Sequence, residues 1–311
     1  MENQAPMSEP RRSIPRTVTP LQVPAIDNTG MLRFPLKQQA LDALVKSALD
    51  EDCAFNDLTT IATVVSDRRG RGTLAAREAG VICGVALALN AFRALDAKVA
   101  IRVDVEDGMR VTPGTSVLFV NGTARALLSA ERVALNFLQR LSGIASLTAQ
   151  YVAAVKGTGA KILDTRKTTP GWRQLEKYAV RAGGGHNHRM DLSSAVLIKD
   201  NHLAAVDGDV GLAVRRSREL ARGIQVEVEC DNLEQVERAL AAGADVIMLD
   251  NMSLDDMRRA VQLVNKRSTL EASGGVTLGT VRGIAETGVD WISVGALTHS
   301  APAMDLALDF D

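Results

Sequence analysis

A repeated alternation of short apolar runs and amphipathic stretches fills the second half of this 311-residue chain and restricts its fold more than any other feature. The apolar runs are typical of buried strands, and the stretches between them have helical periodicity. The strand-like runs cover residues 161–163, 195–198, 225–228, 246–249, 270–272 and 291–294. The helical stretches cover residues 210–222, 233–241, 254–266 and 278–287, with Asn232, Ser253 and Thr277 as expected N-caps. Repeated β-then-α units predict a parallel sheet covered by helices, and this many in series favour a barrel.

The number of strand-like runs predicts an incomplete barrel. Six runs are clear, whereas a complete barrel of this kind has eight strands. We therefore expect an open barrel of seven strands, with one poorly patterned strand near the glycine-rich loop at residues 183–185.

Polar residues or glycines follow every strand-like run. They are Asp164, Thr165, Arg166, Lys167, Lys199, Glu229, Asp250, Ser273, Gly274, Gly275 and Gly295. A single lysine or aspartate in such a place is most simply part of a structural ion pair. Six strands that all end this way favour a functional site, because barrel enzymes bind ligands at this edge. Arg166, Lys167, His188, Arg189 and Lys199 predict a cationic basin that suits a polyanionic substrate.

Two features at this edge suit phosphate and magnesium. Ser273-Gly274-Gly275 precedes the helix expected from Thr277, and bare backbone amides at such a turn can bind an anion, with Gly295-Ala296 as a neighbouring loop. Glu229 and Asp250 could hold Mg²⁺ on a pyrophosphate or hydrogen-bond ribose hydroxyls. They could equally be counter-ions to Lys167 and Lys199, and both roles can hold at once.

The first half of the chain has a different pattern. Strand-like runs separated by short turns, with helices alongside, predict an α+β domain on an antiparallel sheet between about residue 36 and residue 129. A helix is expected from Thr123 to Leu141, with an interruption at Ser142-Gly143 and a second helix up to Lys156. Residues 1–35 contain six of the nine prolines and are expected to form a flexible tail.

Composition excludes several classes of function. The net charge of −1 implies no large basic surface for nucleic acid or acidic lipid, and no apolar run is long enough to span a bilayer. The three cysteines show no metal-ligand spacing and no disulfide framework, which predicts a cytoplasmic protein. His186, His188 and His202 lack the spacing of a helical zinc motif.

Seven motifs in order resemble the quinolinate phosphoribosyltransferase family. They are DTRKTTPG, the GGG…HR loop, LIKDNH, EVE, LDN, SGG and VGALTHS, and the resemblance extends from about Leu36 to the C-terminus. It implies a small α/β sandwich at residues 36–129, to which residues 300–311 return, and an open seven-stranded α/β barrel at residues 130–299. It also implies a dimer or a higher multiple. Asp191 stands where the family commonly has glycine.

The resemblance implies an activity and a role for each site residue. The family joins quinolinate to phosphoribosyl pyrophosphate with Mg²⁺ and releases pyrophosphate and CO₂, a step in NAD biosynthesis. Arg132, Arg166, His188, Arg189 and Lys199 are then expected to hold quinolinate, with Arg132 reaching the neighbouring subunit's site. Lys167, Glu229 and Asp250 would hold the ribose pyrophosphate. Ser273, Gly274, Gly275, Gly295 and His299 would hold phosphate, and Thr165 would contact substrate. The alternatives are a related phosphoribosyltransferase for another ring acid and a non-catalytic phosphosugar-binding protein.

Overall fold

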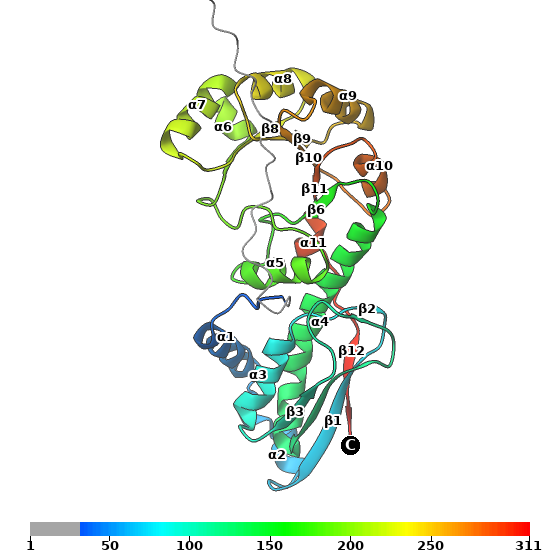
Figure 1. Ribbon diagram of the computed structural model, residues 1–311. Coiled ribbons are helices and arrows are strands. Elements are labelled where there is room, and N and C mark those ends of the chain that lie inside the picture. Colours follow the sequence, from blue (N-terminus) through cyan, green and yellow to red (C-terminus); the bar gives the residue numbers. More distant parts are fainter. Residues whose placement is uncertain (1–31) are drawn as a thin grey trace, which may run out of the picture.

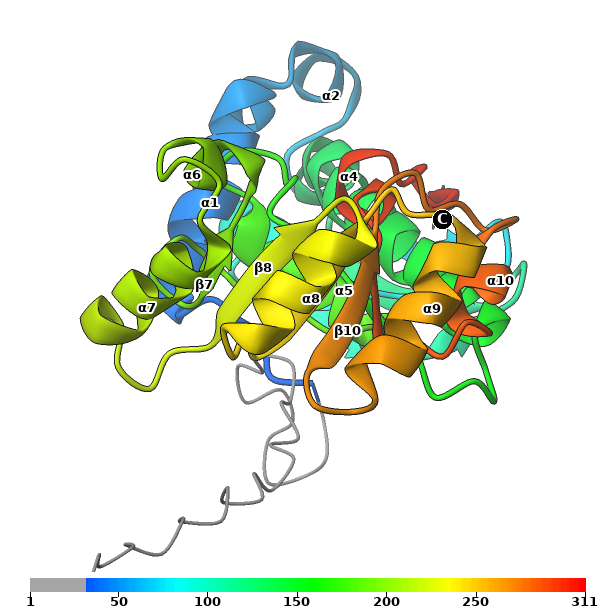
Figure 2. The ribbon, with the colours of Figure 1, turned by 90° about the horizontal axis from the view of Figure 1, so that it is seen from above.

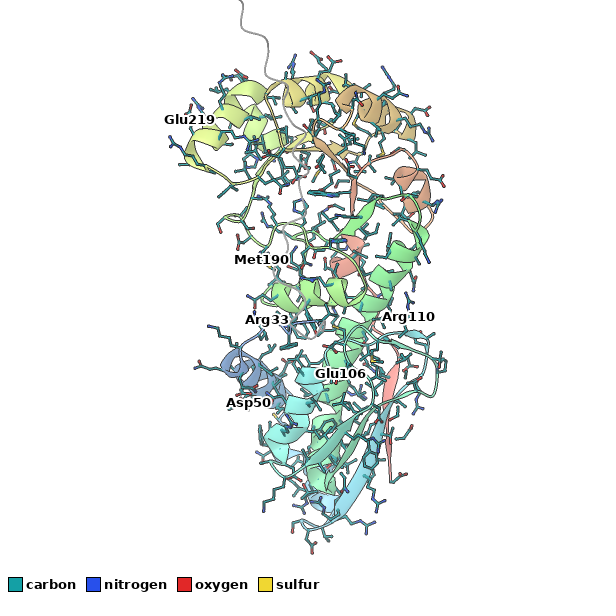
Figure 3. All side chains as sticks on the ribbon, viewed as in Figure 1. Arg33, Asp50, Glu106, Arg110, Met190 and Glu219 are labelled. Carbon is teal, nitrogen blue, oxygen red and sulfur yellow. The ribbon has the colours of Figure 1, made fainter. Side chains whose placement is uncertain are left out.

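The computed structural model describes residues 32–311, in which one long helix joins a small lower part to a larger upper part (Figure 1). That helix, α4 (Ala124–Ala154), contacts elements of both parts. Most of the predicted tail, residues 1–31, lies outside the described residues. Leu32 and Phe34 pack against the core, and the Phe34 ring meets Tyr178 edge to face at 5.5 Å. Figure 3 shows Arg33 at this junction, below α5.

The lower part is built on an antiparallel sheet with strand order β12-β1-β5-β3. Its strands are β1 (Arg69–Ala76), β3 (Ala100–Val103), β5 (Ser116–Thr123) and β12 (Leu306–Phe310), and the short pair β2 (Gly80–Val81) and β4 (Arg110–Val111) lies apart. Its helices are α1 (Gln38–Glu51), η1 (Ala54–Asn56), α2 (Leu58–Thr63) and α3 (Val85–Leu95). Leu87 and Phe92 of α3 are fully buried, and α3 packs against α4. The predicted antiparallel sheet is confirmed, and the C-terminal strand β12 lies at its edge beside β1.

The upper part is a six-stranded parallel sheet with order β6-β11-β10-β9-β8-β7. Its strands are β6 (Lys161–Leu163), β7 (Val196–Ile198), β8 (Val226–Cys230), β9 (Val246–Asp250), β10 (Thr269–Ser273) and β11 (Trp291–Ser293). The helices are α5 (Arg173–Ala182), α6 (Asp200–Ala204), α7 (Val210–Leu220), α8 (Leu233–Ala241), α9 (Leu254–Val264), α10 (Val281–Ala285) and α11 (Ala296–His299). Seen from above, α7, α8 and α9 cover the outer side of the strands (Figure 2). The predicted α/β class is confirmed.

The pairing of the first strand with the last shows how far the sheet closes on itself. β6 pairs with β11, the last parallel strand along the chain. On the other side of β6 a single β-bridge joins Leu163 to His186, after the glycine-rich loop where a poorly patterned strand was expected. In residues 32–311 that position contains the bridge and no longer strand. Because β7 pairs only with β8 among the described strands, the sheet is open between His186 and β7.

The interruption expected at Ser142-Gly143 is wrong, because α4 continues through both residues. Ser142 Oγ accepts a hydrogen bond from Cys83 N–H at 2.9 Å, and a Cβ placed on Gly143 would lie 1.9 Å from the carbonyl oxygen of Pro302. The two small residues therefore let neighbouring backbone approach the helix, and they do not break it. In the described part of the chain no helix is long and apolar enough to cross a membrane.

Candidate functional site

The carboxyl ends of the parallel strands bring most of the predicted site residues to one edge of the sheet. Ser273 pairs with Asp250 at the ends of β10 and β9, and Glu229 lies near the end of the adjacent β8. Lys199 directly follows β7, and Thr165, Arg166 and Lys167 lie in the loop after β6. Sequence spacing alone could indicate this edge because parallel strands end on the same side.

Two acidic residues at this edge have different partners. Glu229 forms an ion pair with Lys199, so the counter-ion interpretation holds for this pair. Asp250 accepts a hydrogen bond from Asn251 Nδ2 at 2.8 Å. Lys199 is partly exposed, with 43% of its side chain accessible.

The predicted phosphate loops are shaped by their glycines. Gly274 has φ +93°, and a Cβ there would lie 2.1 Å from Asn251 Oδ1, so only glycine fits. A Cβ on Gly295 would lie 3.1 Å from His299 Nε2 and 3.3 Å from Lys167 Cδ, which places Gly295, His299 and Lys167 together. The expected helix start at Thr277 is wrong, because α10 begins at Val281. Thr280 instead donates its N–H to the Thr277 carbonyl oxygen at 3.1 Å, a turn that delays the helix.

A fully buried glutamate fixes the loop that carries Lys167. Glu176 accepts hydrogen bonds from Arg140 Nη2 at 2.7 Å, from Thr169 N–H at 3.0 Å and from Thr169 Oγ1 at 2.8 Å. Thr298 Oγ1 donates to the Lys167 carbonyl oxygen at 2.7 Å. The loop is thus held from α4, α5 and α11 together. Sequence reasoning missed Glu176, which looks like an ordinary polar residue of an amphipathic helix.

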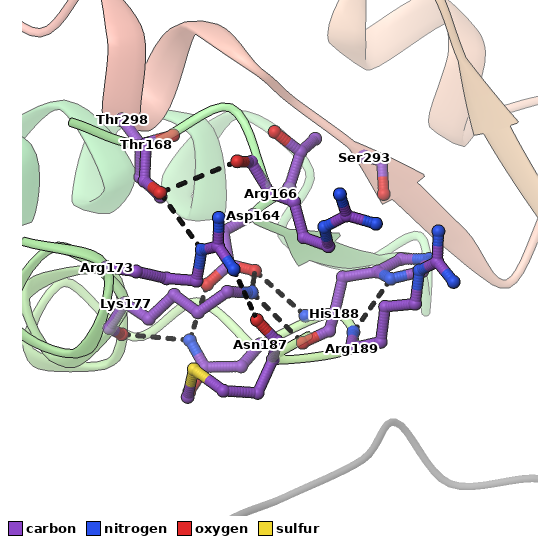
Figure 4. A network of polar contacts seen from close by, with 12 residues as sticks. Asp164, Arg166, Thr168, Arg173, Lys177, Asn187, His188, Arg189, Ser293 and Thr298 are labelled. Atoms are coloured by element: carbon purple, nitrogen blue, oxygen red, sulfur yellow. Dashed lines mark hydrogen bonds and ion pairs between the residues drawn. The ribbon is translucent and has the colours of Figure 1, made fainter. Parts of the chain in front are cut away.

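Asp164 is a structural residue, buried within a network of polar contacts (Figure 4). It forms a buried ion pair with Lys177 of α5 and accepts hydrogen bonds from Asn187 Nδ2 at 2.5 Å and His188 N–H at 2.9 Å. Burial raises the pKa of Asp164 and lowers the pKa of Lys177, because both charges are removed from water. This pair anchors the glycine-rich loop against β6. Lys177 was not identified from the sequence.

Arg166 and Arg189 bring two guanidinium groups close together. Arg189 is 7% exposed and donates from Nη1 to the Ala195 carbonyl oxygen at 3.1 Å. Burial and then the positive charge of Arg166 lower the pKa of Arg189. The Nε of Arg166 is buried and has no hydrogen-bond partner among the residues that the structure describes. Two neighbouring cations with unused donors are suited to an anion that lies between them.

His188 belongs to a buried group with two glutamates. Its Nε2 lies 3.1 Å from Glu227 Oε2 and 3.5 Å from Glu271 Oε2. Burial opposes charge on the ring, but Glu271 and Glu227 outweigh it and raise the pKa of His188, while burial and Glu271 raise the pKa of Glu227. The group therefore retains an additional proton, on Nδ1 or on a carboxylate. Since Nδ1 accepts the Arg189 N–H at 2.7 Å, the raised pKa values belong to the group as a whole, in which the ring and the two carboxylates share the proton.

Glu227 and Glu271 were missed although the sequence contained a signal for them. Each lies two residues before a predicted site position, Glu229 or Ser273, and alternate residues of a strand share a face. The two glutamates therefore form a layer directly below the strand-end residues.

Arg132 lies apart from this edge. It is exposed on the part of α4 that adjoins the small sheet. Its helix neighbours Ser129 and Gln139 bond to Asp57 Oδ2 at 3.0 Å and to the Leu306 carbonyl oxygen at 2.8 Å. The structure of one chain thus brings the predicted strand-end residues together and leaves Arg132 outside.

Comparison with known proteins identifies relatives along most of the chain. Residues 57–142 match the quinolinate phosphoribosyl transferase N-terminal domain, and residues 144–309 match the C-terminal domain of the same family. The nicotinate-nucleotide pyrophosphorylase (carboxylating) of Mycobacterium leprae is 46% identical over 271 residues, which cover 85% of this chain and 95% of the relative. A probable enzyme of the same name from Bacillus subtilis is 43% identical over 260 residues, covering 83% and 89%. The structure of the nicotinate-nucleotide pyrophosphorylase from Francisella tularensis has a TM-score of 0.84 at 38% identity and covers 90% of this chain and 99% of that chain. The chain belongs to the quinolinate phosphoribosyl transferase family.

Proposed function

We propose that this protein transfers the phosphoribosyl group of phosphoribosyl pyrophosphate to quinolinate and releases pyrophosphate and CO₂, giving nicotinate mononucleotide for NAD biosynthesis. The observation that carries the proposal is the match of both domains to relatives named for this activity. The residues at the strand ends support it, because their charges suit one substrate with two carboxylates and another with a phosphate and a pyrophosphate. The free thiols of Cys53, Cys83 and Cys230 suit the reducing cytoplasm.

Quinolinate binding is assigned to the arginine side of the edge. Arg166 and Arg189 form no ion pair with a carboxylate in the described part of the chain, and a guanidinium fork matches a carboxylate bidentately. Lys199 reaches the same edge and would leave Glu229 to contact the second carboxylate. His188 acts differently from the expectation of direct binding, because both of its ring nitrogens face protein groups.

Phosphate binding is assigned to the opposite loops. Lys167, Gly295 and His299 lie together, and any larger residue at Gly295 would press against the other two side chains. Gly274 and Gly275 after Ser273 both have positive φ, a type of backbone conformation in which successive N–H groups can bind an anion. Thr165, whose Oγ1 accepts the Lys167 N–H at 3.0 Å, shapes the loop beside them.

The residues present fit Mg²⁺. Mg²⁺ prefers oxygen ligands and is usually held by one or two carboxylates together with substrate phosphates. Glu229 and Asp250 offer these oxygens on adjacent strands. When bound, the ion would neutralise charge on the pyrophosphate.

The chemistry needs electrostatic stabilisation more than a nucleophile from the protein. When the bond from the ribose carbon to pyrophosphate breaks, positive charge develops on the ribose ring, and the Glu229 and Asp250 carboxylates stabilise it. The pyridine nitrogen then forms the new bond to ribose and becomes positively charged. When CO₂ leaves, the electron pair of the broken bond stays on the ring carbon, stabilised by that positive nitrogen, and a proton from solvent takes its place.

A dimer with shared sites is part of the proposal. Phe55, Leu58, Ile61 and Val65 form an exposed apolar surface, with Leu58 81% exposed. This surface is fixed to α4 by Arg125, which donates to the Val64 carbonyl oxygen at 2.7 Å. An apolar surface beside exposed Arg132 supports a partner subunit whose strand-end edge receives this arginine.

The direct experiment supplies the purified protein with quinolinate, phosphoribosyl pyrophosphate and Mg²⁺ and follows CO₂ and the mononucleotide. We expect both products in equal amounts, and none when either substrate is omitted. Lys199→Met, which removes a cation from the edge, serves as the impaired control. The proposal is wrong if the wild-type protein binds both substrates and forms neither product.

A further inference from the structure

The buried layer below the strand-end residues contains polar side chains to which neither the fold nor the proposed chemistry assigns a role. Glu227 of β8 and Glu271 of β10 are both buried, and Ser293 of β11 donates to Glu271 Oε1. Unpaired buried carboxylates are costly, so their shared neighbour, the His188 ring, indicates what they do.

The two nitrogen atoms of the His188 ring have different partners. Nδ1 accepts the Arg189 N–H at 2.7 Å. A ring nitrogen that accepts a hydrogen bond carries no proton, so the proton of the neutral imidazole lies on Nε2. Nε2 lies 3.1 Å from Glu227 Oε2 and 3.5 Å from Glu271 Oε2, so this N–H lies beside the two carboxylates.

A metal ion is the alternative occupant of this space. His188, Glu227 and Glu271 place possible ligand atoms within 4.8 Å of one another. A metal needs the lone pair of Nε2, and the imidazole proton would then move to Nδ1, where it meets the Arg189 N–H. The geometry therefore favours an N–H donor between carboxylates.

The distances at Nε2 leave its hydrogen bond incompletely formed. Within residues 32–311, His188 Nε2, Glu227 Oε1 and Glu271 Oε2 are buried without a hydrogen-bond partner. Because such atoms are costly, a small rotation of the ring or of a carboxylate that completes this bond is favourable.

The orientation of the His188 ring also affects the next residue, Arg189. The main chain at His188 is fixed on one side, where its N–H donates to Asp164 Oδ1 at 2.9 Å. Its ring fixes the next peptide through Nδ1. We propose that Glu227 and Glu271 are positioning residues, which hold His188 with its proton on Nε2 and thereby hold Arg189 in place for a carboxylate of quinolinate. This inference rests on the proposed function, since it uses Arg189 as a quinolinate-binding residue.

The first test needs no change in the glutamates. Ring-¹⁵N-labelled histidine in the full-length protein gives long-range ¹H–¹⁵N spectra that distinguish a protonated ring nitrogen from a bare one, and His188→Asn assigns the signal. We expect His188 to show a bare Nδ1 and a protonated Nε2, with no change on adding Zn²⁺ or Mg²⁺. A protonated Nδ1, or loss of the Nε2 proton on adding metal, would overturn the inference.

The second test compares two variants of similar size. Glu227→Gln keeps an oxygen that can accept the Nε2 proton, whereas Glu227→Met removes it. We expect Glu227→Met to raise the KM for quinolinate about 10-fold, the effect of one lost buried hydrogen bond. We expect Glu227→Gln to stay near wild type, and the KM for phosphoribosyl pyrophosphate to change in neither variant.

The outcomes separate this inference from the proposed function. If the wild-type protein forms no product, the proposed function fails while the histidine spectra still report the position of the proton. If the wild type turns over but Glu227→Gln and Glu227→Met raise both KM values equally, the glutamates act only through packing and the inference is wrong.

Discussion

At the scale of single residues, the buried pair Asp164–Lys177 shows that position after a strand does not define a ligand-binding residue. Both side chains are almost completely buried, and they hold the glycine-rich loop that carries His188 and Arg189. Removing one partner of such a pair leaves an uncompensated buried charge. The pair thus supports the site without facing its ligand.

Lys177→Met should lower the free energy of unfolding by about 3–5 kcal/mol near neutral pH. The variant leaves Asp164 buried without its cation, so its folded-state pKa rises further above the unfolded value. The loss therefore grows as pH rises through that folded-state pKa and is smallest in acid, where Asp164 is protonated in both states. Urea unfolding at about pH 5 and about pH 8 measures this difference.

Lys46→Met is the matched control, because its ion pair with Asp50 is exposed and should contribute at most about 0.5 kcal/mol. A loss for Lys177→Met that is equally small, or that does not depend on pH, would contradict the buried-charge explanation.

Lys167→Ala should mainly weaken binding of phosphoribosyl pyrophosphate, and Arg189→Ala mainly that of quinolinate. Lys167 lies with Gly295 and His299, whereas Arg189 lies with Arg166. Loss of a charged hydrogen bond predicts about 10- to 100-fold weaker binding in each case. Calorimetric titration of each substrate into each variant measures the two binding affinities. Equal losses of affinity for both substrates in both variants would show that these roles are wrongly assigned.

Much of the site could be predicted from residue types at strand ends, and its supporting residues could not. Glu229 and Ser273 follow from the strand pattern. Lys177 and Glu176 lie on a helix whose periodicity does not tell a buried polar position from an exposed one. Their partners come from distant parts of the chain, which a single sequence does not pair.

At the scale of elements, α4 is the structural link between the two parts of the molecule. Its first half packs against the small sheet, and its second half contacts α5 and β6. The sequence predicted a break at Ser142-Gly143 because both residue types are common at helix ends. Tertiary packing explains why they are present instead, since the backbone at Pro302 lies against Gly143.

Gly143→Ala should destabilise the protein by about 1–3 kcal/mol, although alanine favours a helix. The added methyl would lie 1.9 Å from the Pro302 carbonyl oxygen. Gly283→Ala in α10 is the control, because there the new methyl meets only Leu254 Cδ1 at 3.5 Å. Thermal unfolding of both variants measures the change in stability. A stabilised Gly143→Ala variant would show that the contact with the Pro302 backbone is not tight.

The barrel strands were predicted to within two residues, because buried parallel strands are short apolar runs. The segment that pairs with β6 on its open side was harder to predict, because its glycines leave no apolar pattern to recognise. In the described residues only the β-bridge at His186 marks this segment. Thr277 looked like a cap because threonine and a following apolar residue occur both in caps and in turns.

At the scale of the whole molecule, the proposed shared site explains an arginine that the single chain leaves exposed. Arg132→Ala and Lys167→Ala homodimers should each be nearly inactive. Their heterodimer has one site with both lesions and one with neither, so exchange of subunits should restore about one working site per dimer. Turnover by isolated, doubly tagged heterodimers is the measurement. Heterodimers as inactive as their parents would mean that Arg132 serves its own chain.

The number of carboxylates in the substrate tests the central claim most directly. Turnover should be measured with phosphoribosyl pyrophosphate and Mg²⁺ plus either quinolinate or nicotinic acid, which lacks the second carboxylate. Because the edge presents Arg166, Arg189 and Lys199, more cations than one carboxylate needs, we predict mononucleotide and CO₂ from quinolinate and no comparable product from nicotinic acid. Comparable kcat/KM for the two acids would contradict the account.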